Sequence, residues 1–169
     1  MSSRRAADLA LRPARADDEP FQLRVYASTR EEELAPVPWS AEQKAAFVAQ
    51  QFAAQSDHYA RHYAGMSADV ILVDGVPAGR LLVARWDAEI RIVDIAILPE
   101  FRGRGAGEVL LRGLMAEADA AGKPVSIHVE HTNRALGLYR RLGFRPVGEH
   151  GPYLRMQWDP PCDQPKIAS

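Results

Sequence analysis

The stretch Ile90–Leu111 reads IRIVDIAILPEFRGRGAGEVLL and is the most informative part of the chain. Its apolar run from Ile90 to Leu98 is typical of a buried strand, and Pro99 ends that strand. A glycine-rich turn over residues 102–107 follows, and a helical pattern begins directly after it.

A turn of this kind at the start of a helix presents free backbone N–H groups, and the helix dipole adds positive potential there. Gly103, Gly105 and Gly107 have no Cβ, so a bulky anion can approach the backbone closely. Arg102 and Arg104 add positive charge. The residues therefore predict a phosphate or pyrophosphate site, and the alternative is a tight turn that uses glycine for its conformation only.

Two common nucleotide motifs do not match this turn. A P-loop needs Gly-Lys-Ser/Thr after its glycines, and that triplet is absent here. A dinucleotide fingerprint needs a third glycine at the position that Glu108 occupies. Such a fingerprint also follows its strand directly, whereas residues 99–102 intervene here.

The pattern Arg102-x-x-Gly105-x-Gly107 resembles the acyl-CoA-binding motif of the GNAT superfamily of N-acyltransferases. A second block, residues 133–144, reads NRALGLYRRLGF and resembles a later motif of the same family. The two blocks occur in family order and together cover about residues 90–145. The resemblance implies acetyl-CoA as the acyl donor. It assigns cofactor contacts to Ile97, Leu98, Arg102, Gly103, Arg104, Gly105, Ala106, Gly107, Asn133 and Tyr139.

Hydrophobic periodicity and turn residues predict an α/β fold. The expected strands are 9–12, 69–73, 76–86, 90–98, 125–130, 144–149 and 153–158, and the expected helices are 16–33, 40–63, 105–121 and 132–142. Ser40 and Gln43 predict a capping box, and Asp74-Gly75 predicts a hairpin turn. The resemblance adds a GNAT-like mixed, mostly antiparallel sheet of about seven strands, with a splayed parallel central pair and four helices on both faces.

The 169 residues are 47% hydrophobic and 25% charged, which suits one globular domain over residues 9–158 with tails at 1–8 and 159–169. The net charge of −1 gives no basic footprint for nucleic acid, and no apolar run suits a membrane span. The start of the chain lacks the apolar core of a signal peptide, so a cytoplasmic location is expected. The single cysteine, Cys162, lies among prolines and is not expected to be a nucleophile.

Tyr139 is the first candidate catalytic residue. In the family that the chain resembles, the matching tyrosine protonates the departing thiolate of the cofactor. A phenol of pKa about 10 can donate to a thiolate whose conjugate acid has a pKa near 8.5. The alternative is a packing tyrosine on an amphipathic helix. Asn133 could hold an amide of the pantetheine arm or cap the following helix, and Thr132 competes with it for both roles.

Asp94 interrupts an otherwise apolar strand, where a carboxylate is costly unless it is bonded or neutral. It could act as a general base, directly or through water. The alternative is a structural aspartate bonded to a neighbouring strand, for instance to His128. Glu33 and Trp39 lie in the region that covers the acceptor pocket in GNAT enzymes. The alternative for Glu33 is a solvated run of charged residues, and the alternative for Trp39 is a hydrophobic contact that staples the following helix.

The favoured function is direct transfer of an acetyl group from acetyl-CoA to the amine of a small molecule, peptide or protein. No metal is implied, because no Cys/His/acid cluster has ligand spacing. The alternatives are a non-catalytic module that senses acyl-CoA or another small ligand, and a transferase with a longer acyl or aminoacyl donor. Exposed edges at the C-terminal strands make a homodimer plausible.

Overall fold

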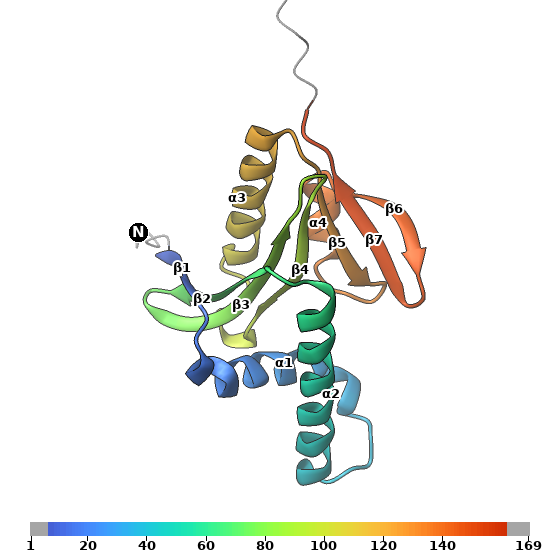
Figure 1. Ribbon diagram of the computed structural model, residues 1–169. Helices are drawn as coiled ribbons and strands as arrows, with labels where there is room; N and C mark the ends of the chain where they lie inside the picture. Colours follow the sequence, from blue (N-terminus) through green and yellow to red (C-terminus); the bar gives the residue numbers. More distant parts are fainter. Residues whose placement is uncertain (1–6, 162–169) are drawn as a thin grey trace, which may run out of the picture. The chain divides into compact units, whose positions relative to one another are not determined.

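Residues 7–161 are the part of the chain that the computed structural model describes, and they form seven β-strands and four α-helices (Figure 1). The strands are β1 (Leu9–Pro13), β2 (Ser67–Val73), β3 (Val76–Arg85), β4 (Ile90–Ile97), β5 (Val125–Glu130), β6 (Arg145–His150) and β7 (Tyr153–Trp158). The helices are α1 (Glu19–Leu34), α2 (Ala41–His62), α3 (Ala106–Ala121) and α4 (Leu136–Arg141). Cys162 lies outside the described residues, as do most positions of the two expected tails.

The strands form one mixed sheet in the order β1-β2-β3-β4-β5-β7-β6. The pairs β1–β2, β2–β3, β5–β7 and β6–β7 are antiparallel, and β4–β5 is parallel. Residues 90–92 of β4 pair with residues 125–127 of β5, and the register of this parallel pair runs no further within the described chain. The predicted fold class is confirmed.

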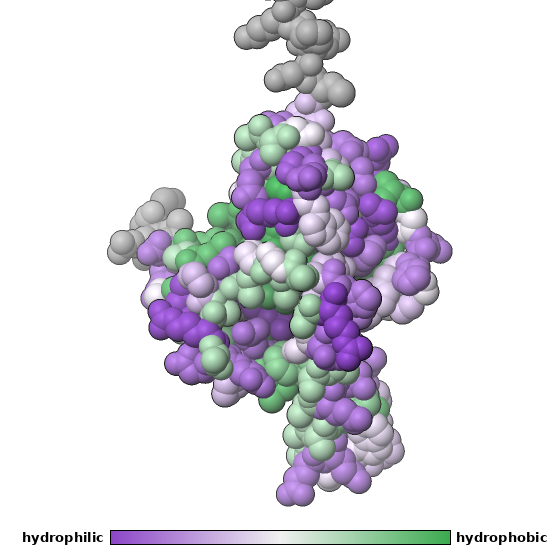
Figure 2. All heavy atoms as spheres, in the orientation of Figure 1, coloured by the Kyte–Doolittle hydropathy of each residue, from purple (hydrophilic) through white to green (hydrophobic). Residues whose placement is uncertain are grey.

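The contacts divide the described chain into two compact units, residues 7–84 with 94–106 and residues 85–93 with 107–161. In the first unit, α1 and α2 pack through a core of Tyr26, Leu34, Val48 and Phe52. Figure 1 shows α2 running transverse to α1. The surface of α2 is a mixture of weakly apolar and hydrophilic residues in the view of Figure 2.

Two local predictions in the first unit are confirmed. The Ser40 hydroxyl accepts from the Gln43 amide at 3.1 Å, and the Gln43 side chain accepts from the Ser40 amide at 2.9 Å. This capping box satisfies free N–H groups at the start of α2. Asp74 and Gly75 both have positive φ, 50° and 79°, as a tight hairpin turn between β2 and β3 requires.

The second unit is built on β5, whose residues Val125, Ile127 and Val129 are buried. Along α3 a stripe of buried residues recurs at helical spacing: Leu110, Leu111, Leu114 and Ala118. Arg85, the last residue of β3, donates from Nε to both carboxylate oxygens of Glu117 on α3, at 3.1 and 2.9 Å.

The helix expected over 132–142 is shorter in the structure and begins at Leu136. Asn133 explains the difference, because its amide donates to the Glu130 carbonyl and its side-chain oxygen accepts from the Ala135 amide at 2.8 Å. These bonds hold a turn in place of the first helical turn.

Candidate active site

The glycine-rich loop lies between β4 and α3. After β4, Pro99–Phe101 form a single 3-10 turn, and α3 begins at Ala106. Gly103 and Gly105 have φ of 75° and 80°, a left-handed conformation that glycine adopts without strain. A Cβ built on either glycine would meet nothing within 4 Å, so the space in front of the loop is open.

The first N–H groups of α3, including that of Gly107, have no intrahelical partner. With the helix dipole they suit a phosphate group, and the open glycine backbone lets a phosphate approach. The loop therefore has the shape and polarity that a CoA pyrophosphate needs.

The two arginines of the loop are placed differently. Arg102 folds back and donates from Nε to the Ile97 carbonyl at 2.9 Å, which holds the loop against the end of β4. Arg104 is exposed, and its guanidinium lies 5.7 Å from the centre of the Phe101 ring. Leu98 is buried, and its amide donates to the Ala78 carbonyl of β3 at 2.8 Å. Arg102 is thus positioned as a support of the loop, whereas Arg104 is free to reach an anion.

Asp94 has a partner on the neighbouring strand β3. Its Oδ2 accepts from Nε of Arg80 at 2.8 Å, and Arg80 also donates to the Gln55 side chain at 2.6 Å. The Arg80 side chain is 3% exposed and its guanidinium lies over the Phe52 ring. The Asp94 side chain is 25% exposed, and its Oδ1 has no partner among residues 7–161. Oδ1 is therefore the atom that could still hold a water molecule.

Glu33 and Trp39, the two expected acceptor residues, both contact residues that are near them in the sequence. Glu33 accepts from Arg30 at 3.0 Å, one helical turn away. Trp39 is 42% exposed and packs edge-to-face on Phe47 of α2, with ring centres 5.3 Å apart. A pocket of about 470 Å³ lies between α1 and α2, and neither Glu33 nor Trp39 lines it.

Tyr139 and Asn133 belong to the second unit. Tyr139 is the inward residue of the short helix α4 and is 2% exposed. Its ring meets Phe144 edge-to-face at 5.6 Å, and its carbonyl accepts from the Phe144 amide at 2.9 Å. Asn133 uses its side-chain oxygen in the turn before α4, which leaves the N–H₂ group for a ligand carbonyl.

A buried polar cluster in the second unit was not predicted. Arg91 of β4, which is 7% exposed, donates to Ser126 at 2.7 Å and to Glu89 at 2.9 Å. The other Glu89 oxygen accepts from Ser126 at 3.0 Å and from Arg155 of β7 at 3.3 Å. The Arg91 guanidinium also lies 5.5 Å from the Trp86 ring centre. The only signal in the sequence was the charge of Arg91 inside an apolar run.

His128 lies on the same face of β5 as Ser126. Burial lowers the pKa of His128, and Arg91, Arg155 and His150 lower it further, while the charge of Glu89 opposes them. The ring is therefore neutral near pH 7 and sits in cationic surroundings.

Comparison with known proteins identifies the family. Residues 24–144 match the Acetyltransferase (GNAT) family. The chain belongs to this family.

Two curated relatives match part of the chain. It is 39% identical over 83 residues to a candidate ribosomal protein bS18-alanine N-acetyltransferase of Bacillus subtilis, which covers 47% of this chain. It is also 39% identical over 71 residues, 40% of this chain, to a GCN5-like protein acetyltransferase of Mycobacterium tuberculosis. The matched segments span 54% and 34% of the two relatives, about half of their length or less.

Solved structures share the fold at low identity. The PaiA N-acetyltransferase of Thermoplasma acidophilum, solved in complex with coenzyme A, aligns with a TM-score of 0.68 at 13% identity, over 90% of this GNAT chain and 99% of that one. The ribosomal-protein-S18-alanine N-acetyltransferase of Escherichia coli aligns with a TM-score of 0.59 at 18% identity, over 96% and 100% of the two chains.

None of the helices within residues 7–161 has the length and apolar character needed to span a membrane. Within the same residues, no three His, Cys, Asp or Glu side chains gather in a way that could hold a metal ion.

Proposed function

We propose that this GNAT chain transfers an acetyl group from acetyl-CoA to a primary amine by direct attack. The observation that carries the proposal is the loop over residues 102–107, with two left-handed glycines, open space in front of them and free amides at the start of α3. Such a loop suits the pyrophosphate of coenzyme A.

The remaining cofactor contacts follow the family motifs. Ile97 and Leu98 line the path of the pantetheine arm, Arg104 pairs with a phosphate, and Asn133 donates to an amide carbonyl of the arm. A backbone amide near Ile97 polarises the thioester carbonyl in the manner of an oxyanion hole.

The proposed chemistry begins with deprotonation of the acceptor. Its ammonium group passes one proton to bulk solvent through a water molecule held at Oδ1 of Asp94. The neutral amine attacks the thioester carbonyl and forms the new C–N bond. The nitrogen of the tetrahedral intermediate then loses a second proton to the same water, the C–S bond breaks, and the Tyr139 hydroxyl protonates the thiolate. Coenzyme A leaves as the free thiol, and Tyr139 regains its proton from solvent.

A coupled assay of coenzyme A release tests the role of Tyr139. Tyr139→Phe keeps the ring and removes the proton donor, so turnover should fall about 10²-fold or more with little change in acetyl-CoA affinity. Tyr26→Phe is the matched control, because Tyr26 is also buried and its hydroxyl accepts from Arg30 at 3.2 Å. Equal turnover in the two variants would reduce Tyr139 to a packing residue.

The acceptor is proposed as an amine of a small molecule, or of a peptide or protein. Two similar proteins are named for the alanine of a ribosomal protein, which favours including alanine-initiated peptides in the first amine panel. The acceptor contacts proposed for Glu33 and Trp39 predict that alanine at these positions raises the acceptor KM more than the acetyl-CoA KM.

A non-catalytic sensor would bind acetyl-CoA and release no coenzyme A with any amine. A longer acyl or aminoacyl donor would be found by mass spectrometry of the co-purified thioester. We also propose that the protein is a cytoplasmic homodimer. Light scattering measures the molar mass in solution and so tests the dimer directly.

A further inference from the structure

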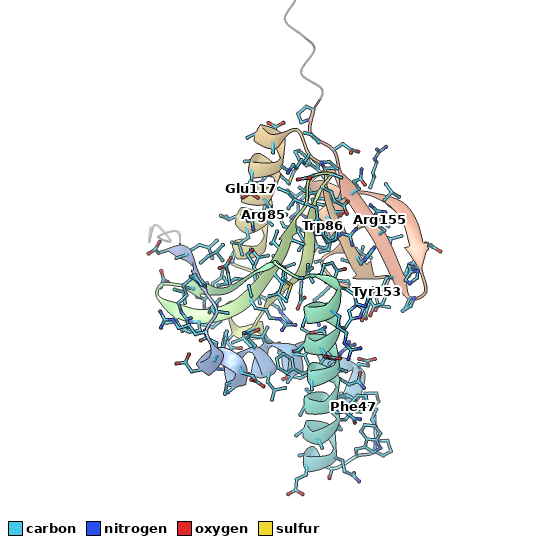
Figure 3. All side chains as sticks on the ribbon, viewed as in Figure 1. Phe47, Arg85, Trp86, Glu117, Tyr153 and Arg155 are labelled. Carbon is cyan, nitrogen blue, oxygen red and sulfur yellow. The ribbon has the colours of Figure 1, made fainter. Side chains whose placement is uncertain are left out.

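One face of the hairpin formed by β6 and β7 continues the polar face of β5. Tyr153 and Arg155 lie two residues apart along β7 and therefore share a face (Figure 3). In the antiparallel register His128 of β5 is opposite Arg155, and Glu130 is opposite Tyr153. The face thus brings a histidine, a glutamate, an arginine and a tyrosine onto neighbouring strands.

Around Glu89 this face brings two guanidinium groups to one carboxylate, while Glu130 lies further along β5. Glu89 is bonded by Arg91 on one oxygen and by Ser126 and Arg155 on the other, so its carboxylate is fully used. Two guanidinium groups therefore share one carboxylate. The lowered pKa of His128 agrees with such cationic surroundings.

Within the cluster, Arg155 has most of its hydrogen-bond donors without partners. A guanidinium carries five N–H donors, and Arg155 makes one hydrogen bond, to Glu89 at 3.3 Å. Its Nε is the only buried side-chain nitrogen or oxygen atom without a hydrogen-bond partner among residues 7–161. The side chain as a whole is 41% exposed, so a small turn of the guanidinium can present unused donors to a ligand. An orphan donor of this kind requires an explanation, and a bound acceptor group would supply one.

There is room for a ligand beside Arg155. Its neighbour on β6 is Gly148, which has no side chain, and a Cβ built there would meet nothing within 4 Å. Tyr153 is 38% exposed, and no hydrogen bond to its hydroxyl is found in the described chain. His150 faces Tyr153 across the hairpin. The open surface at Gly148 therefore lies beside several hydrogen-bond donors for which no partner is found in the described chain.

The position of His128 links this face to the reaction. His128 follows directly after Ile127, the last residue of β5 that pairs with β4. The family resemblance implies that the pantetheine arm enters where these two strands separate.

We propose that the acceptor amine also carries a carboxylate, and that Arg155 binds this carboxylate on the polar face of β5, β7 and β6, with His128 and Tyr153 beside it. The inference rests on the proposed acetyl transfer and narrows its substrate class to amino acids and related amino carboxylates. A planar carboxylate matches the forked donors of a guanidinium, which makes arginine the residue suited to this contact.

The experiment uses three matched series of acceptors with one to five methylene groups: ω-amino acids, their carboxamides and plain alkylamines. Coenzyme A release is measured for each with the wild-type chain and with Arg155→Met. The wild-type chain should prefer an acid over its amide. Arg155→Met should raise the KM for that acid about 10- to 150-fold, the range for loss of a charged hydrogen-bond partner, and should leave the KM of the amide unchanged.

Arg85→Met is the matched control. Arg85 lies in the same unit and has nearly the same exposure, 44% against 41%, but its Nε, unlike that of Arg155, donates to a carboxylate, that of Glu117. In this variant the ratio of the KM for the acid to the KM for its amide should be the same as in the wild type. Arg155→Lys should recover part of the preference, because lysine restores the charge without the fork.

The possible failures are distinguishable. If alkylamines and amides release coenzyme A as well as the acids do, or if Arg155→Met raises the KM of acid and amide equally, the carboxylate site is wrong and the acetyl transfer stands. If acetyl-CoA binds and none of the three series releases coenzyme A, the proposed function fails and the inference fails with it.

Discussion

Substitution of Gly105 by valine is the most direct test of the pyrophosphate loop. Gly105 has a φ of 80°, and a Cβ there would project into open space in front of the loop. A valine side chain would occupy the space through which a phosphate must approach the free amides of α3. We therefore expect Gly105→Val to lose acetyl-CoA binding while the protein stays folded.

The magnitudes follow from two opposing effects. A left-handed conformation costs an L-residue about 1–2 kcal/mol, which lowers the Tm of a domain of this size by about 2–8 °C. Acetyl-CoA at 100 times its Kd stabilises the wild-type chain by about 2.7 kcal/mol, which raises its Tm by about 5–11 °C. The second shift should be present in the wild type and absent in Gly105→Val.

Gly122→Val supplies the matched control. Gly122 follows α3, has a φ of 68°, and a Cβ there also meets nothing within 4 Å. This variant should show a similar loss of Tm without ligand and a full acetyl-CoA shift. Differential scanning fluorimetry with and without acetyl-CoA measures both quantities. A full ligand shift in folded Gly105→Val would refute the assignment of the loop.

Two further predictions concern stability. Gly79→Ala should lower the free energy of unfolding, measured in urea, by about 1–3 kcal/mol, because its Cβ would collide with the Ala96 carbonyl oxygen on β4. Gly113→Ala, with open space on α3, is the control and should raise the free energy of unfolding by about 0.5–1 kcal/mol. An unchanged free energy of unfolding in Gly79→Ala would contradict the close approach of β3 and β4 at this position. The folded pKa of His128 is below its unfolded value near 6.5, so the unfolded chain binds the extra proton and stability should fall as pH drops below about 6.5. His128→Asn should show a smaller loss of Tm between pH 8 and pH 5, and an unchanged loss would argue against the lowered pKa of His128.

Local features were predictable wherever neighbouring residues determine the conformation. The capping box of Ser40 and Gln43, the turn at Asp74-Gly75 and the glycine loop after Pro99 all form through contacts within a few positions. Each depends on the chemistry of single residues, such as a hydroxyl that can cap a helix or a glycine that tolerates positive φ. These features, with the two family motifs, were enough to predict the fold class, and they are the basis on which the loop over residues 102–107 is proposed as the cofactor site.

One local prediction was wrong for a related reason. The amphipathic pattern over residues 132–142 favours one helix, and the structure begins α4 at Leu136 instead. Asn133 could form either a helix cap or a turn, and the two use the same side-chain oxygen. The sequence left this choice open because both outcomes satisfy the local backbone.

The partners of the charged residues were decided by tertiary structure alone. Asp94 has a carboxylate that could have met His128 or another group, and the register of the strands places Arg80 beside it instead. Arg91, Ser126 and Arg155 converge on Glu89 from positions up to 66 residues apart. Strand register determines which polar side chains share a face, and a shift of one residue would separate all of these groups. Residue types alone therefore predicted where a phosphate could bind, whereas the Nε of Arg155 that lacks a hydrogen-bond partner became visible only once the strands were paired.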